Sequence, residues 1–111
     1  MIPGDNRPWI GVDLDGTLAE FHGWSDEIGK PINTMMSRVF KWLHEGKTVK
    51  IVTARAANQK EVEKIHAWLS EQGFPLLEVT DRKDYMMTEL WDDRAIQVLT
   101  NTGIAVRIVP A

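Results

Sequence analysis

The sequence predicts an α/β fold, a three-layer sandwich whose mostly parallel, Rossmann-like sheet has five strands. Short apolar runs that suit buried strands alternate with segments whose apolar residues have helical spacing. Polar residues follow most of these runs directly. Because parallel strands all run in the same direction, their carboxyl ends should lie along one edge of the sheet. We therefore expect residues 1–111 to form one domain with its polar site at that edge.

Strands are predicted at the short apolar runs. The first covers residues 9–13, after a lead-in whose prolines and glycine discourage regular structure. Others are expected at residues 48–52, 76–80 and 105–109, and a short strand from Glu89 ends in an acidic pair. These five strands make up the predicted sheet.

Helices are predicted between the strands. One starts near Asn33 and ends at Gly46, and its apolar residues recur at intervals of three and four. A second runs from about residue 57 to 72, and a short third helix is expected at residues 95–99. The alternation of strands and helices is the basis of the parallel arrangement.

Composition and charge limit the function classes. The chain has 111 residues, a net charge of -3 and no cysteine. Disulfide and thiol chemistry are therefore excluded, and mild acidity argues against a nonspecific polyanion-binding surface, so nucleic acid is an unfavoured partner. No apolar run approaches the length of a membrane span, and the first residues lack the apolar core of a signal peptide. We expect a cytoplasmic enzyme with no membrane contact.

The central motif is Asp13-Leu14-Asp15-Gly16-Thr17-Leu18, which follows the first strand directly. If the backbone stays extended through Leu14, the two carboxylates point to the same side, and Gly16 permits a turn into a cleft. Two adjacent anions there require a cation. Mg²⁺ is the expected ion because its usual ligands are one or two carboxylates and a substrate phosphate.

Further polar residues follow the later strands. Thr53 and Arg55 come after the second strand and could hold phosphate oxygens, although a threonine there is also a common helix cap. Lys83 follows the next strand and could neutralise carboxylate and phosphate charge. Asp92 and Asp93 end another strand and repeat the acidic pair of the first. The two acidic pairs are expected to converge on one metal, and Thr53 and Lys83 to lie along the same edge of the sheet.

The segment of residues 19–32 contains glycines and a proline, and we interpret it as a loop or short hairpin that overhangs the site. Phe21, His22 and Trp24 would then contact the substrate, and Trp24 could stack on a base or sugar. The alternative is that these aromatic residues only hold the loop against the body of the protein.

The set of motifs resembles the haloacid dehalogenase (HAD) superfamily of phosphohydrolases. The segment Asp13–Leu18 matches the first motif of that superfamily, Thr53 the second, Lys83 the third and Asp92-Asp93 the fourth. The order and placement match from about residue 9 to residue 109. For the third motif, the neighbouring Arg82 is the alternative to Lys83.

This resemblance implies an HAD-like fold and a role for each residue. Asp13 would be the nucleophile that forms an aspartyl-phosphate, and Asp15 the general acid and base. Thr53 and Lys83 would bind the phosphoryl group. The Mg²⁺ ligands would be Asp13, Asp15 through its backbone carbonyl, Asp92 and Asp93.

The spacing of the motifs leaves no room for a cap domain, so the chain looks like a small capless HAD-type phosphatase. The expected partner is a small phosphomonoester, such as a nucleotide. The chain has five tryptophans, and a homodimer is also an expectation, although no sequence feature locates its interface. Alternatives are a 3'-phosphatase acting on polynucleotide ends, and a noncatalytic phosphate-binding or receiver-like signalling module.

Overall fold

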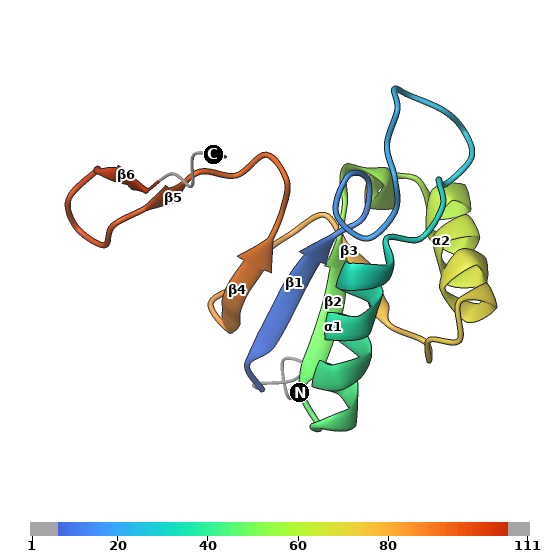
Figure 1. Ribbon diagram of the computed structural model, residues 1–111, viewed down its shortest axis with the longest axis horizontal. Coiled ribbons are helices and arrows are strands. Elements are labelled where there is room, and N and C mark those ends of the chain that lie inside the picture. The colour runs from blue at the N-terminus through green and yellow to red at the C-terminus, as the bar shows by residue number, and fades with distance from the viewer. Residues whose placement is uncertain (1–6, 107–111) are drawn as a thin grey trace.

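The computed structural model describes residues 7–106, and its main feature is a parallel sheet of four strands (Figure 1). β1 is Trp9–Asp13, β2 is Thr48–Val52, β3 is Glu78–Thr80 and β4 is Met87–Trp91. These strands lie in the order β3-β2-β1-β4. The predicted α/β class and parallel sheet are confirmed, whereas the sheet has four strands in the described residues and not five.

Two α-helices and a short 3₁₀ helix connect the first three strands. α1 (Asn33–His44) joins β1 to β2, and η1 (Ala54–Ala57) followed by α2 (Gln59–Glu71) joins β2 to β3. α2 begins after Asn58, whose side-chain oxygen accepts a hydrogen bond of 2.9 Å from the backbone N–H of Lys60. Within residues 7–106, neither helix is long and apolar enough to cross a bilayer.

Both helices pack against the same face of the sheet. The buried core joins alternate residues of β1 and β2 to apolar residues of α1 and α2: Ile10, Val12, Val49, Ile51, Met36, Val39, Ile65 and Leu69. Because alternate residues of a strand point to one face, the two helices cover that face. Right-handed crossovers that step in the same direction produce this arrangement. The predicted third layer is absent from the described chain, since residues 81–86 return from β3 to β4 without a helix.

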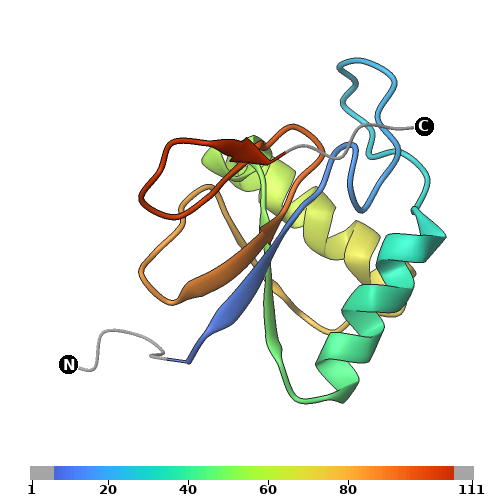
Figure 2. The same ribbon diagram turned by 60° about the vertical axis from the view of Figure 1, so that its left-hand side comes forward.

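The C-terminal part differs from its prediction. β5 (Gln97–Val98) and β6 (Ala105–Val106) form an antiparallel hairpin, which lies beyond the carboxyl end of β4 in both views (Figures 1 and 2). The helix predicted at residues 95–99 is wrong because β5 lies within it. Gly103, with φ of 72°, helps to reverse the chain into β6, so this strand pairs with β5 and does not extend the parallel sheet. The rest of the strand predicted at residues 105–109 lies outside the described residues.

Candidate active site

All four strands of the sheet end at one cavity of about 750 Å³. Asp13 is the last residue of β1, and the residues that directly follow β2, β3 and β4 are Thr53, Asp81 and Asp92. The charged residues that complete the lining are Asp15, Arg55, Asp93 and Arg94. Ligands of open α/β sheets bind at the carboxyl ends of the strands. We therefore take this cavity as the candidate active site.

The loop after β1 is held in place by buried leucines and backbone hydrogen bonds. Leu14 and Leu18 are fully buried. The carbonyl of Leu14 accepts hydrogen bonds from the N–H groups of Leu18 at 3.0 Å and Ala19 at 2.9 Å. Gly16 has a φ of 87°, and a Cβ atom at this position would collide with the carboxylate of Asp93. The leucines of the motif thus anchor the loop, and its glycine allows an acidic side chain to approach the backbone.

Three carboxylates, from Asp13, Asp92 and Asp93, form an acidic group in the cavity. One oxygen from each lies within 4.8 Å of the others. Burial and the negative charges of Asp92 and Asp93 raise the pKa of Asp13 from 3.8 to about 7. The cluster therefore carries negative charge that no side chain in it neutralises. Hard oxygen donors at this spacing fit a divalent cation such as Mg²⁺. Three of the four predicted metal ligands are brought together here.

The carboxylate of Asp15 is bound by Arg55 and lies outside the acidic group. Nε of Arg55 donates a hydrogen bond of 2.8 Å to Oδ2 of Asp15, and Nη2 donates one of 3.1 Å to Oδ1. Nη1 of Arg55 also donates a hydrogen bond of 2.8 Å to Oε1 of Glu61. Arg55 is 6% exposed, and its hydrogen bonds to Asp15 raise the pKa of its guanidinium further. A bidentate pair of this kind determines the orientation of the carboxylate.

Thr53 is both a helix cap and part of the cavity lining. Its hydroxyl accepts a hydrogen bond of 3.2 Å from the backbone N–H of Arg55, at the start of η1. Its own N–H donates to the carbonyl of Thr80 at 2.8 Å, which links the ends of β2 and β3. The residue is buried and lines the cavity. The two interpretations of this threonine from the sequence are therefore compatible.

The predicted loop overhangs the cavity with two of its three aromatic residues. Phe21 and Trp24 line the cavity and are 42% and 71% exposed. The Trp24 ring lies 4.6 Å from the guanidinium carbon of Arg55, which also donates a hydrogen bond to the carbonyl of Ser25. His22 does not line the cavity, and its Nε2 lies 3.1 Å from Oε1 of Glu20. The loop is thus joined to the site through Arg55.

The cation predicted after β3 is not placed in the cavity. Lys83 is exposed and is not among the lining residues. Arg82, the alternative cation, is also exposed, and its Nε lies 3.9 Å from the carboxylate of Asp81. The choice between these two side chains as a phosphate-binding group stays a prediction.

Three charged residues of the site were not identified from the sequence. Asp81 directly follows β3, so the rule that selected Asp13 and Asp92 also applies to it. Arg94 lines the cavity two residues after Asp92. Glu61 lies in α2, and no local pattern distinguishes it from the other acidic residues of that helix; it reaches the site because Arg55 pairs with it.

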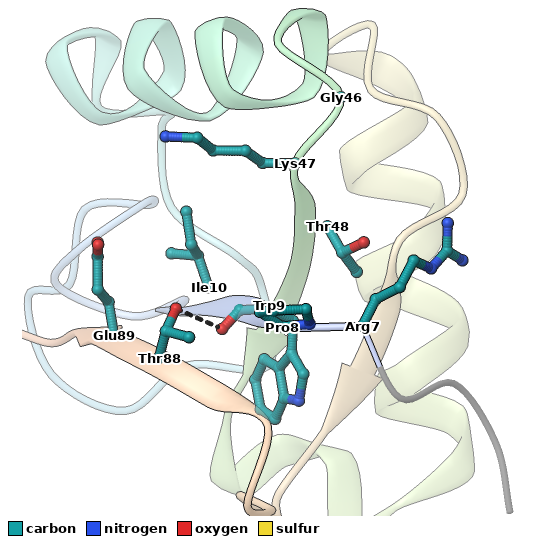
Figure 3. A pocket seen from close by; sticks show the side chains of 9 residues that line it. All are labelled: Arg7, Pro8, Trp9, Ile10, Gly46, Lys47, Thr48, Thr88 and Glu89. Atoms are coloured by element: carbon teal, nitrogen blue, oxygen red, sulfur yellow. Dashed lines mark hydrogen bonds between the residues drawn. The ribbon is translucent and has the colours of Figure 1, made fainter.

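A second cavity lies at the opposite end of the sheet and differs in chemistry. Its volume is about 340 Å³, and Trp9, Thr48 and Thr88 line it where β1, β2 and β4 begin (Figure 3). The hydroxyl of Thr88 donates a hydrogen bond of 3.2 Å to the carbonyl of Trp9. Its lining includes a single carboxylate, that of Glu89. Across residues 7–106, the group of acidic side chains spaced closely enough to hold a metal ion lies at the carboxyl end of the sheet.

Comparisons with protein-family models, with curated proteins and with solved structures found no match for this chain. The function is therefore inferred from the chain's own motifs and from the geometry of the cavity. The most specific parts of that geometry are the acidic group of Asp13, Asp92 and Asp93 and the pairing of Asp15 with Arg55.

Proposed function

We propose that this chain is an Mg²⁺-dependent phosphomonoester hydrolase with an HAD-like fold. The observation that carries the proposal is the acidic group of Asp13, Asp92 and Asp93 at the carboxyl ends of parallel strands. A second carboxylate two residues after Asp13, that of Asp15, lines the same cavity. The order of the motifs along the chain supports the assignment to the HAD superfamily. The proposed substrate is a small phosphomonoester.

In the proposed reaction Asp13 is the nucleophile. One of its carboxylate oxygens attacks phosphorus while the bond from phosphorus to the leaving oxygen breaks, and an aspartyl-phosphate forms. Water then attacks that phosphorus and releases inorganic phosphate and the free carboxylate. The raised pKa of Asp13, about 7, means that the carboxylate is only partly ionised at neutral pH unless a cation compensates the charge around it.

Asp15 is the proposed general acid and base. It gives a proton to the leaving oxygen in the first step and takes one from the attacking water in the second. Both of its oxygens are bound by Arg55, so Arg55 determines where the proton is delivered. Because both oxygens accept hydrogen bonds from Arg55, one of these bonds has to be exchanged for the leaving group in the first step.

Mg²⁺ would be held by the carboxylates of Asp13, Asp92 and Asp93. When bound, the ion offsets their charge and polarises a phosphoryl oxygen. The hydroxyl of Thr53 would contact the phosphoryl group, and Lys83 would have to turn toward the cavity to do so. Positioning and electrostatic stabilisation of this kind account for most of the catalysis of phosphoryl transfer.

The test is a screen of the purified protein with Mg²⁺ against nucleotides, sugar phosphates and phosphorylated oligonucleotide ends. Phosphate release from at least one of them is expected, and Asp13→Asn should lower kcat by about 1,000-fold or more. Unchanged turnover by Asp13→Asn would remove Asp13 as the nucleophile. If no compound is hydrolysed although Mg²⁺ binds, the hydrolase proposal fails and a noncatalytic phosphate-binding role is favoured.

A further inference from the structure

The cavity contains more negative than positive charge, which limits how it can hold an anionic substrate. Its lining has five carboxylates and two guanidiniums. The two guanidiniums are those of Arg55 and Arg94. The guanidinium of Arg55 already pairs with Asp15 and Glu61. One divalent cation does not reverse this balance. The electrostatic attraction between the cavity and an anionic substrate is therefore weak. Part of the binding free energy has to come from an uncharged part of the substrate.

An uncharged, planar binding surface is present at the mouth of the same cavity. Trp24 is 71% exposed although it lines the cavity, and its ring lies 4.6 Å from the guanidinium carbon of Arg55. The guanidinium supports one side of the ring, and the exposed area leaves room for a second planar group. Exposed tryptophan is a favourable stacking surface for nucleobases. Phe21, 42% exposed, lines the same cavity.

The position of Trp24 indicates that this surface would bind the leaving group and not the phosphoryl group. Trp24 is joined through Arg55 to Asp15, the proposed proton donor to the leaving oxygen. The acidic group, which would hold Mg²⁺ and which contains the proposed nucleophile Asp13, does not include the carboxylate of Asp15. A group stacked on Trp24 therefore lies on the leaving-group side of the reaction. Arg55 is held by Asp15, Glu61 and the carbonyl of Ser25, so the tryptophan has an ordered support.

We propose that the leaving group is a nucleoside whose base stacks on Trp24, so that the substrate class is the nucleoside monophosphates. This inference rests on the proposed hydrolase function. A mononucleotide is favoured over a polynucleotide end because the acidic lining would also repel the additional phosphates of a strand. The cavity volume, about 750 Å³, is within the range of small-molecule sites.

The test compares nucleoside 5'-monophosphates with ribose 5-phosphate, which has the same phosphate ester and no base. With Mg²⁺, kcat/KM for the best nucleotide should exceed that for ribose 5-phosphate by about 10- to 100-fold, the range that base stacking supplies. Trp24→Ala should bring this ratio close to one, and Trp24→Phe should keep part of it. Tyr85→Ala is the matched control: Tyr85 is fully exposed and does not line the cavity, so its loss should leave the ratio unchanged.

The outcomes separate this inference from the proposed function. Equal kcat/KM for the two substrates, with turnover still lost in Asp13→Asn, would overturn the nucleoside assignment and leave the hydrolase proposal standing. Faster turnover of a 3'-phosphorylated oligonucleotide than of any mononucleotide would also overturn it. Calorimetric titration of Asp13→Asn, whose turnover should be nearly abolished, with a nucleoside 5'-monophosphate and Mg²⁺ measures binding alone: this variant should bind at least about tenfold more tightly than Asp13→Asn/Trp24→Ala. Equal affinities would contradict the proposal.

Discussion

Arg55 and Asp15, forty positions apart in the sequence, form a bidentate ion pair in the lining of the candidate active-site cavity, with hydrogen bonds of 2.8 Å and 3.1 Å. The guanidinium is almost completely buried, and Glu61 and the carbonyl of Ser25 complete its set of partners. Through its contacts, Arg55 connects the turn that follows β1, the 3₁₀ helix after β2, and the loop of residues 19–32 that contains Phe21 and Trp24. Its pair with Asp15 is the contact through which these three segments determine the position of the proposed general acid.

Arg55→Lys should lower kcat strongly while it lowers the folding stability only slightly. A lysine keeps the charge but cannot donate two parallel hydrogen bonds, so Asp15 loses its fixed orientation. We expect kcat to fall about 10- to 100-fold while the fold is kept. Steady-state kinetics and thermal unfolding of the same sample measure both effects. Arg55→Ala is expected to cost more folding free energy than Arg55→Lys, because Asp15 loses its cation and Glu61 keeps only its salt bridge of 3.0 Å to Lys64. Wild-type kcat in Arg55→Lys would show that Asp15 does not depend on this pair.

The raised pKa of Asp13 predicts how the stability of the metal-free protein depends on pH. The folded value, about 7, lies above the unfolded value of 3.8, so between these limits the folded state binds more protons than the unfolded state. The contribution of Asp13 is complete below pH 4 and is lost as the pH rises through about 7. In the presence of a chelator, the Tm of the wild type should therefore fall between pH 5 and pH 8. The Tm of Asp13→Asn should fall less over this range, and at pH 8 it should be higher than that of the wild type.

The same shift predicts a pH-dependent effect of Mg²⁺. Because binding of the ion requires ionised carboxylates, the gain in Tm from added Mg²⁺ should be larger at pH 8 than at pH 5. Thermal scans with and without the ion at both pH values test this. An equal gain at the two pH values would contradict the assignment of Asp13 as a ligand.

Gly16→Ala should disrupt the proposed metal site, and Gly46→Ala is its matched control. Both glycines have positive φ, 87° and 82°, so alanine should cost about 1–2 kcal/mol of folding free energy at either position. A Cβ at Gly16 would also collide with the Asp93 carboxylate, whereas at Gly46 it meets no atom within 4 Å. Only Gly16→Ala should weaken Mg²⁺ binding and turnover. Equal Mg²⁺ affinity in the two variants would show that the approach of Asp93 is not needed.

Asp92→Asn and Asp81→Asn should have different effects on metal dependence. Both residues follow strands and line the cavity, but only Asp92 belongs to the acidic group. We expect Asp92→Asn to raise the Mg²⁺ concentration for half-maximal turnover by at least about tenfold. Asp81→Asn should change it by less than about threefold, since Asp81 is outside the group. Titration of turnover with Mg²⁺ measures this, and the reverse order of effects would reassign the ligands.

The parallel arrangement of the first strands and both α-helices could be predicted from the sequence because the elements themselves depend on local patterns. Apolar runs, helical spacing and glycine at the end of α1 act over a few residues. The C-terminal region was predicted incorrectly for the same reason. Residues 95–99 are apolar enough for a short helix, but the following turn with Gly103 pairs β5 with β6. Five residues are too few for their apolar spacing to distinguish a helix from a strand.

The sequence by itself identified most of the charged and polar residues of the candidate site, although not Asp81, Arg94 or Glu61. Asp13, Thr53 and Asp92 were selected because each lies at the end of an apolar run, and parallel strands end at one edge of a sheet. The tertiary structure alone decided how these residues divide into two groups. Asp92 and Asp93 meet Asp13, while Asp15 turns to Arg55 and, through it, to Glu61 and Trp24. Such pairings depend on packing between segments far apart in the chain, and a local pattern contains no information about distances across the fold.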